Sequence, residues 1–479
     1  MDRKTLRYTG RLVAILAIAA ALRIWYSLYL PGHGRDLLHS DMAAYDESAW
    51  KMVEGLPVEG QPGFNGYHAL SANTYNYPGY IYFVAAIYAI FGHSPLAVRA
   101  VQGVVGTATV WVVYVLGAVT FGRCPGLIAA ALTAIYLPLV YYTGFLLSET
   151  WFLFLQLAAL ALWIKAWGPT ASRDAPADTS KDPSLSELIG AEAYSGHANI
   201  LVAGLAGIMA GAACITRAAF LPAVAAMAVL AWWSPPKSES RRRRTAMIAA
   251  FIIAASATVA PITWRNWQIH GRFILVTTNG PSTFYVGHVT HTAFIPNMTP
   301  GITDMAMAEE HRRLSWQYLR HGWAEYLAEL PEFFSDMWLS GDFWPNATTY
   351  WRFEPAFDPR RPVRMRVVID EVGGPPFGRL DYFPDLVRYC DRLVWLLVGL
   401  PLGLLALCFL PKDQRSWLVL YAALIPYLLI PLLAPGFARY RIPAVPLLFI
   451  LAGQTICELI RCRRGSGSHQ SEGGRGAGR

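Results

Sequence analysis

Apolar blocks of roughly 20 residues recur along this chain and limit its possible folds more than any other feature. A helix of that length crosses the hydrocarbon core of a bilayer and satisfies every backbone polar group within its own segment. Only 15% of the 479 residues are charged, whereas soluble domains carry roughly 25%. The pattern predicts an all-α polytopic membrane protein of about ten transmembrane helices. We expect spans at 9–30, 95–121, 124–146, 149–167, 197–215, 217–234, 245–264, 391–410, 416–434 and 441–460.

The basic residues gather in short loops between these blocks and near both ends of the chain. With about ten spans, these loops and both termini fall on one side of the membrane, which the positive-inside rule makes the cytoplasmic side. We therefore expect a multi-pass protein of the plasma (inner) membrane. The net charge of +8 fits this topology signal and does not indicate nucleic-acid binding. The residues on that side are Arg3, Lys4, Arg7, Arg11, Arg123, Lys237, Arg241 to Arg244, Lys412, Arg415, Arg461, Arg463 and Arg464.

Two long segments, about 31–77 and 265–389, would then lie on the extracytoplasmic side. The second is predicted to contain an amphipathic helix from Asp304 to about Leu339, because apolar residues recur there at helical spacing. The apolar stretch from Pro78 to Gly92 is short for a span and is predicted to be a juxtamembrane helix.

The chain has one predicted domain, residues 1–460, followed by a disordered basic cytoplasmic tail at 461–479 that is rich in Gly and Ser. The six cysteines form no close C-x-x-C pair, so neither a disulfide framework nor a zinc site is predicted. No phosphate-binding glycine motif of the P-loop or dinucleotide type occurs, so ATP hydrolysis is not supported.

Charged residues at the outer ends of the predicted spans are the first functional signal. Ionisable groups in this setting are costly and often functional, and the positive-inside bias disfavours arginine there. Several arginines at one level suggest a bound anion, and phosphate fits because guanidinium binds it through two parallel hydrogen bonds. Each arginine could instead snorkel to the interface or pair with a carboxylate. These residues are Arg23, Arg99, Glu149, Arg217, Arg265, Arg439 and Arg441.

Two acidic residues at the same interface are the second signal, since Asp41 follows the first span and Glu149 opens the fourth. One carboxylate could accept the proton of an attacking hydroxyl as a general base. The other could orient a group or hold a divalent cation such as Mg²⁺ or Mn²⁺. Asp41 could equally cap a helix, Asp46 competes with it for the catalytic role, and Glu149 could be a dipole partner of its own helix. On residue type alone these structural interpretations are favoured, and two carboxylates do not define a metal site.

Six sequence blocks occur in an order that is typical of one superfamily. The first three are SDMAAYDESAWKMVEG, YPGYIYFVAAIYAIFG and PLAVRAVQGVVG. The next is YYTGFLLSETWFLF, which carries Glu149 where many relatives carry Asp, and the last two are ITWRNWQIHGRFILVTTNGPSTFYVGH and RYRIPAVPLLFILAG. Together they resemble the GT-C superfamily of polytopic glycosyltransferases. The resemblance covers roughly 9–460 and is to the branch that holds protein O-mannosyltransferase-like enzymes and bacterial lipid A aminoarabinose transferases.

This resemblance implies a GT-C-like bundle that transfers a hexose or pentose, with inversion, from a polyprenyl-phosphate donor to a hydroxyl of a protein, glycolipid or polysaccharide at the outer membrane face. Asp41 would be the catalytic base and Glu149 a second active-site carboxylate. The candidates for binding the donor phosphate are Arg265, Arg439, Arg441, Arg99, Arg217 and Tyr440, and the other site candidates are Asp46, Tyr45 and Tyr77.

Two other classes of protein remain open from the residues alone. A secondary transporter or flippase of lipid-linked sugars predicts ionisable residues or broken helices near the bilayer midplane, and often a repeat. The sequence shows neither feature clearly. An accessory membrane subunit is disfavoured by the two long outer segments and by the acidic residues that face the same side.

Overall fold

The computed structural model describes residues 3–29, 41–56, 74–167, 196–233, 240–290, 304–339, 349–355, 365–371, 383–410, 417–434 and 438–472. These residues are almost entirely helical, as predicted. The longer helices are α1 (Arg3–Tyr29), α2 (Asp41–Val53), α3 (Pro78–Phe91), α4 (Pro95–Phe121), α5 (Arg123–Ile135), α7 (Glu149–Trp167), α9 (Gly196–Thr216), α10 (Leu221–Trp233), α11 (Arg241–His270), α13 (Asp304–Trp338), α16 (Trp417–Leu429) and α17 (Val445–Glu472). The short helices are α6 (Leu137–Tyr141), η2 (Tyr142–Gly144), η3 (Ala218–Phe220), α12 (Gly280–Phe284), η4 (Tyr285–Thr290), α14 (Phe383–Cys390), η6 (Asp391–Gly399), α15 (Leu400–Leu405), η7 (Ala406–Phe409), η8 (Ile430–Leu432) and η9 (Ala438–Arg441).

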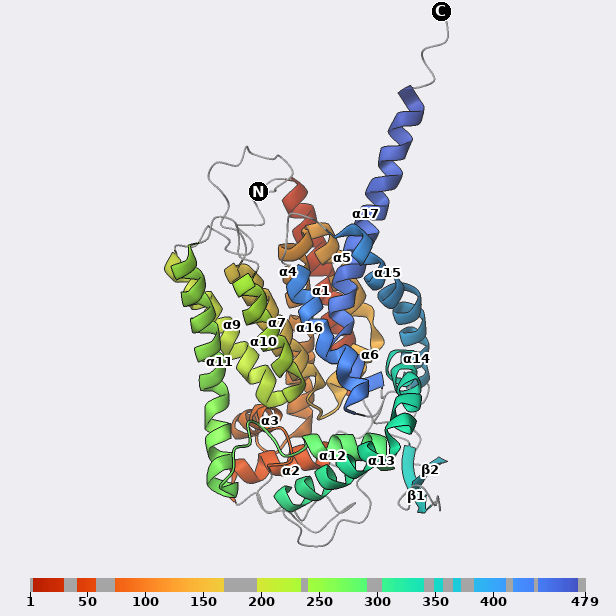
Figure 1. Cartoon of the computed structure of the whole chain (residues 1–479). Helices are drawn as coiled ribbons and strands as arrows, with labels where there is room; N and C mark the ends of the chain where they lie inside the picture. Colours follow the sequence, from red (N-terminus) through yellow and green to blue (C-terminus); the bar gives the residue numbers. More distant parts are fainter. Residues whose placement is uncertain are drawn as a thin grey trace, which may run out of the picture.

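The long apolar helices stand side by side as a bundle, and a second layer crosses one end of it (Figure 1). α11 packs on α9, α9 on α7, and α7 on α4, while α17 packs on α5. The crossing layer consists of α2, α3, α12 and α13. The first turn of α1 and the last turn of α17 lie at the opposite end of the bundle. The start of α1 and the end of α17 therefore lie on the same side of the bundle, which is compatible with the predicted topology.

The number of spans is lower than predicted when only long, continuous helices are counted. In the described ranges, seven helices are long and apolar enough to cross a membrane, or eight if α5 and the helix after it, bent by 60°, form one broken span. The predicted spans 217–234 and 416–434 correspond to the shorter apolar helices Ala218–Trp233 and Trp417–Leu432. Proline explains part of the difference, because Pro138 and Pro426 remove backbone donors from their helices. Ten full-length spans are therefore not confirmed.

Small residues let the helices approach closely, as expected where lipid provides little hydrophobic driving force between them. A Cβ at Gly207 would lie 2.3 Å from the carbonyl oxygen of Phe251, so α9 and α11 nearly touch through their backbones. A Cβ at Gly126 would lie 2.7 Å from the carbonyl oxygen of Tyr114, which brings α5 equally close to α4. These contacts fix the helices whose ends carry the polar residues described below.

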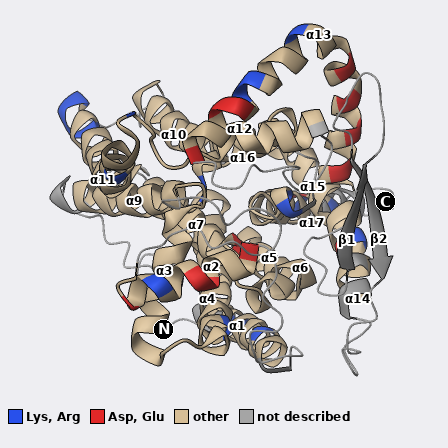
Figure 2. Ribbon diagram, turned by 90° about the horizontal axis from the view of Figure 1, so that it is seen from below, with Lys and Arg blue, Asp and Glu red and all other residues tan. Residues whose placement is uncertain are grey.

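The crossing layer agrees with the predicted helices. α3 is a 14-residue apolar helix in place of the predicted stretch Pro78 to Gly92, and Gly92 ends it at a φ of 73° that suits glycine. α13 matches the predicted amphipathic helix from Asp304 to about Leu339, with a kink at Gly322. Acidic and basic residues occur along α13 when the bundle is seen from this end (Figure 2).

Two features differ from the sequence-based expectations. A short antiparallel hairpin, β1 (Thr349–Pro355) and β2 (Met365–Glu371), pairs Thr349 with Glu371 in a chain expected to be all-α. The tail predicted to be disordered from residue 461 is helical through Glu472. A helix that is already formed and buried extends at little cost, because each added residue contributes one further hydrogen bond.

Candidate active site

Glu149 is the centre of a buried polar cluster at the end of the bundle that the second layer crosses. It is the first residue of α7, and its side chain is 1% exposed. Its Oε1 accepts hydrogen bonds from Arg217 Nη2, at 2.7 Å, and from Arg439 Nε. Its Oε2 has no hydrogen-bond partner among the described residues. The carboxylate is thus held from one side by two cations and keeps one oxygen available.

Arg439 joins the two predicted catalytic carboxylates. It lies in η9, and its Nη1 donates to Asp41 Oδ2 at 3.2 Å while its Nε binds Glu149. Burial lowers the pKa of Arg439, but Glu149 and then Asp41 outweigh that effect and raise it well above its usual value. The guanidinium is therefore permanently charged and has two anions to orient it.

Asp41 is the more accessible of the two carboxylates. It begins α2, and its side chain is 45% exposed, whereas that of Glu149 is 1% exposed. An incoming hydroxyl could reach Asp41 without displacing protein, which a general base requires. It is the first residue of α2, where a negative charge is favourable, and its role as the catalytic base stays a prediction.

Arg217 is held in place by contacts other than its carboxylate. It stands between α9 and η3, where its Nε donates to Ser148 Oγ at 3.0 Å. Its Cζ lies 5.8 Å from the centre of the Phe152 ring. The guanidinium is therefore fixed from three sides, including the ion pair with Glu149, and does not simply snorkel to the membrane surface.

Three predicted tyrosines surround this cluster. Burial raises the pKa of Tyr45, and Asp41 raises it further. Burial also raises the pKa values of Tyr77 and Tyr440, although the arginines of the cluster oppose the shift. Tyr45 packs edge-on against Tyr80 with ring centres 4.9 Å apart. All three hydroxyls stay protonated at neutral pH and can donate hydrogen bonds to an anion.

Asp46, the competing acid, does not join the cluster. Its carboxylate accepts a hydrogen bond from the Tyr88 hydroxyl. Its two oxygens lie 3.0 and 2.9 Å from His93 Nε2, and that imidazole stacks on Trp50 with ring centres 4.7 Å apart. Asp46 therefore joins α2 to the end of α3 and serves the fold.

The contacts described for the remaining predicted phosphate ligands do not place them at this cluster: these are Arg99, Arg265 and Arg441. Arg441 forms its ion pair with Asp391 and donates to the Met337 carbonyl at 2.7 Å. Arg99 is buried in α4 among tyrosines. Arg265 is half-buried near the end of α11. Their predicted role as phosphate ligands stays a prediction, and the location of Arg441 argues for a different one.

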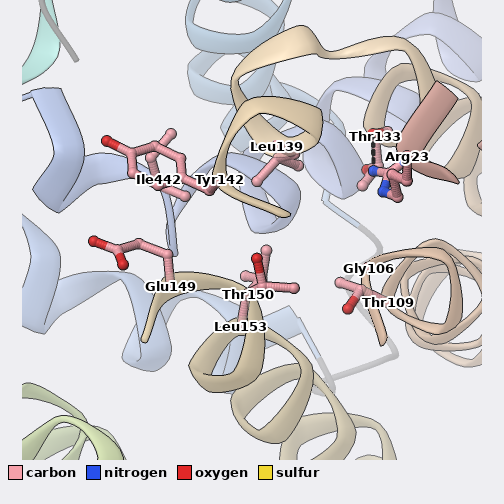
Figure 3. Close-up of a pocket in the computed structure, with 10 residues that line it drawn as sticks. All are labelled: Arg23, Gly106, Thr109, Thr133, Leu139, Tyr142, Glu149, Thr150, Leu153 and Ile442. Atoms are coloured by element: carbon pink, nitrogen blue, oxygen red, sulfur yellow. Dashed lines mark hydrogen bonds between the residues drawn. The ribbon is translucent and has the colours of Figure 1, made fainter. Parts of the chain in front are cut away.

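Arg23 is near Glu149, although it was named in the sequence only as an outer-end charge. Both residues line a small cavity, and Figure 3 shows them on opposite sides of it. Arg23 is 1% exposed and donates to the carbonyls of Ala19, Ala134 and Thr133 at 3.1 to 3.3 Å. It forms no ion pair with the described residues. An arginine on the side disfavoured by the positive-inside rule was the only sequence signal for it.

The divalent cation that Asp41 and Glu149 could hold stays a prediction. No group of three or more His, Cys, Asp or Glu side chains gathers among the described residues. Arg439 binds one oxygen of Asp41 and one of Glu149, so a cation between these carboxylates would meet a fixed positive charge. The two carboxylates are contacted by two arginines, Arg217 and Arg439, and Arg23 lies across the small cavity from Glu149.

One stretch of the sequence, which includes Glu149, matches a known protein family. Residues 76–173, which hold α3 to α7 and include Glu149, match the family described as dolichyl-phosphate-mannose-protein mannosyltransferase. No curated protein sequence compared with the chain matches it.

Solved structures resemble the whole described bundle. The archaeal oligosaccharyltransferase AglB from Archaeoglobus fulgidus, in complex with an inhibitory peptide and a dolichol-phosphate, has a TM-score of 0.54 at 16% identity and is matched over 100% of this chain and 53% of its own. ArnT from Cupriavidus metallidurans bound to undecaprenyl phosphate has a TM-score of 0.51 at 14% identity, over 93% of this chain and 60% of its own. The chain has the GT-C fold.

The GT-C resemblance and the all-α membrane fold predicted from the sequence are thereby confirmed. The chain spans between half and two thirds of the length of these two solved proteins. At such low identity the match concerns the GT-C fold and not the reaction. The roles of individual residues therefore have to be argued from the geometry of the cluster.

Proposed function

We propose that this protein is a GT-C glycosyltransferase that moves a sugar from a polyprenyl-phosphate donor to a hydroxyl acceptor, with inversion, at the extracytoplasmic face of the plasma membrane. The observation that carries the proposal is Arg439, a buried cation that contacts both Asp41 and Glu149. The family match and the lipid phosphates named in the two similar structures support the class of donor.

Charge explains why such a cluster suits this chemistry. A lipid-phosphate-linked sugar is a phosphodiester with one negative charge. When the bond between the sugar and the phosphate breaks, the lipid keeps a phosphate monoester, which gains a further negative charge. Arg439 and Arg217 are held in place as hydrogen-bond donors near the position where that charge would develop. Such preorganised electrostatic stabilisation is often the largest single contribution to catalysis. The two contacting arginines balance the two carboxylates, and Arg23 on the opposite side of the small cavity adds a positive charge that can attract the donor.

Asp41 and Glu149 then have different roles. Asp41, with its half-exposed carboxylate, takes the proton from the acceptor hydroxyl as its oxygen attacks the anomeric carbon. The bond between that carbon and the phosphate oxygen breaks on the opposite face, and the electron pair leaves with the lipid phosphate. Glu149 is buried and bound to both arginines, so it orients the phosphate ligands and is not the base.

The membrane orientation completes the proposal. The positive-inside rule predicts that both ends of the chain face the cytoplasm. The cluster joins η9 to Asp41, the first residue of α2, and α2 lies at the opposite end of the bundle (Figure 1). A lipid donor can reach this end from the membrane while the acceptor approaches from solvent. A transporter of lipid-linked sugars would be expected to have its charged site near the midplane, whereas the proposal puts this cluster at the outer membrane face.

The test is sugar transfer by purified, detergent-solubilised protein with a panel of polyprenyl-phosphate sugars and cell-envelope extract as acceptor. Wild type is compared with Asp41→Asn, Glu149→Gln and Arg439→Lys. A matched control is Glu310→Gln with Arg313→Gln, an exposed ion pair on α13. Transfer by wild type and control, and its loss in folded Asp41→Asn, are expected. Folded wild type that neither transfers nor hydrolyses any donor of a broad panel would overturn the proposal.

A further inference from the structure

We infer that Arg441 is a positioning residue, and that its buried ion pair with Asp391 fixes η9 so that Arg439 can contact Asp41 and Glu149 at once. This inference rests on the proposed function of Arg439. It assigns Arg441 a role different from the phosphate contact expected from its place in the RYRIP motif. The evidence is the set of contacts around each end of the ion pair.

Arg441 is among the most completely buried side chains that the structure describes, at 0% exposure. Its Nη2 binds Asp391 Oδ2, and its Nη1 donates to the carbonyl of Met337 at 2.7 Å. Its Cζ lies 5.4 Å from the centre of the Trp395 ring. These contacts come from η6 and from the last turn of α13, so Arg441 joins η9 to both.

Asp391 is bound just as firmly on its other side. The hydroxyl of Tyr136, at the corner between α5 and α6, donates to Asp391 Oδ1. Trp395, one turn further along η6, donates through Nε1 to the carbonyl of Trp338 at 2.8 Å. The ion pair is therefore the centre of a closed contact between η6, α13 and the bundle.

η9 needs such an anchor, because a helix of four residues does not stabilise itself. In a 3₁₀-helix successive residues turn by about 120°, so residues two apart point to different sides. Arg439 faces the carboxylate cluster, and Arg441 faces Asp391. Fixing Arg441 therefore fixes the position and rotation of η9, and with them the direction in which the Arg439 side chain extends.

The contact most sensitive to this placement is the one between Arg439 Nη1 and Asp41, at 3.2 Å. A displacement of about 1 Å would take it beyond hydrogen-bond range. Misplacement of that size at a catalytic group can cost about a hundredfold in rate. Arg439 would then keep Glu149 and lose its hold on the proposed base.

The experiment removes the ion pair without leaving a buried charge. Asp391→Leu with Arg441→Met replaces both partners by apolar side chains, an exchange that buried ion pairs often tolerate. The double variant is made in wild type and in Arg439→Lys, and kcat and KM for the donor are measured in all four proteins. Arg441→Lys, which keeps the charge but not the forked geometry, tests partial rescue. Glu310→Gln with Arg313→Gln is the control on α13.

A positioning role predicts that kcat falls by about ten- to a hundredfold in the double variant, and falls little further when Arg439 is already Lys. Arg441→Lys should lie between wild type and the double variant. Equal losses in both backgrounds would show that the pair acts independently of Arg439 and would overturn the inference. An unchanged kcat in a folded double variant would do the same.

A structure of the double variant distinguishes this failure from failure of the proposed function. If Arg439 has lost its contact with Asp41 there, the positioning role stands even when no donor is turned over by wild type. If Arg439 keeps both carboxylates without the ion pair, the positioning role is wrong whatever the activity.

Discussion

Arg439 and Arg441 are two residues apart in η9, yet they serve two different kinds of buried cluster. Around Arg441 the carboxylate is enclosed by protein, since Asp391 is bound on both oxygens and is 0% exposed. Around Arg439, Asp41 is 45% exposed and one oxygen of Glu149 has no partner among the described residues. The closed cluster suits a structural joint, whereas the open one has capacity left for a ligand.

The difference teaches how buried ion pairs should be interpreted. Desolvation makes such pairs weak sources of stability, and removing one partner is far more costly than removing both. A fully buried pair whose carboxylate is bound on both oxygens is therefore suited to holding elements together. The cluster around Arg439 has an exposed carboxylate, and arginines lie beside it, so it can stabilise negative charge that a substrate brings.

The largest expected effect is that of Asp41→Asn on sugar transfer. Removal of a general base lowers rates by about 10²–10⁴-fold, and the side chain is exposed enough that the free energy of unfolding should change by only about 0.5 kcal/mol. Transfer rates and thermal unfolding of the same preparation measure both. If the rate fell less than about threefold, Asp41 would not be the base that this chemistry needs.

Asp391→Asn should show the opposite pattern. It leaves Arg441 buried without a counter-charge, which costs about 3–5 kcal/mol of stability, while Asp391→Leu with Arg441→Met should recover most of that loss. Thermal or denaturant unfolding in detergent measures the difference. Comparable unfolding of Asp391→Asn and wild type would mean that the cluster around Arg441 is not closed in solution.

The third prediction is that a ligand stabilises the protein through the cluster around Arg439 and not through the cluster around Arg441. Polyprenyl phosphate that binds the open cluster at a hundred times its Kd should stabilise wild type by about 2.7 kcal/mol. Arg439→Gln should abolish this shift, because it removes a cation that contacts both carboxylates. The control pair Glu310→Gln with Arg313→Gln should retain it. A full shift in Arg439→Gln would place the phosphate elsewhere.

The contrast between the two clusters also shows what the sequence could reveal. Apolar length predicted the positions of the spans, and the wrong-side arginines pointed to one end of the bundle. Asp41, Glu149, Arg217 and Arg439 do meet there, with Tyr45, Tyr77 and Tyr440 around them. Topology brought these residues to one end because the membrane confines charges to its two faces, but their catalytic roles came from the GT-C resemblance and stay predictions.

Which arginine pairs with which carboxylate was beyond the reach of the sequence. Arg439 and Asp41 are 398 positions apart, and their contact depends on the rotation of η9. Arg439 and Arg441 appear equivalent in the RYRIP motif, and Asp391 opens an apolar block without any signal that it is buried. Only tertiary packing distinguishes the two arginines, which is why Arg441 was grouped with the phosphate ligands.

The smallest predicted effect concerns the first half of α13. The last turn of this helix contacts Arg441 through Met337, and the question is whether the first half packs on α12 and η4 independently of that contact. Burial lowers the pKa of His311 to about 4, although Glu310 opposes the shift. His311 shares a hydrogen bond of 2.9 Å with Ser282 and stacks on Tyr285 with ring centres 4.3 Å apart.

Because the folded state resists protonation of His311, its contribution to stability is complete above pH 6.5. It is lost as the pH falls from 6.5 towards 4, where the unfolded segment binds a proton that the folded one excludes. We expect α13 to lose about 1–2 kcal/mol of protection from hydrogen exchange over this range. His311→Gln should remove the pH dependence. If it persists in that variant, another group on α13 or beneath it controls docking, and the two ends of the helix cannot be treated as separate contacts.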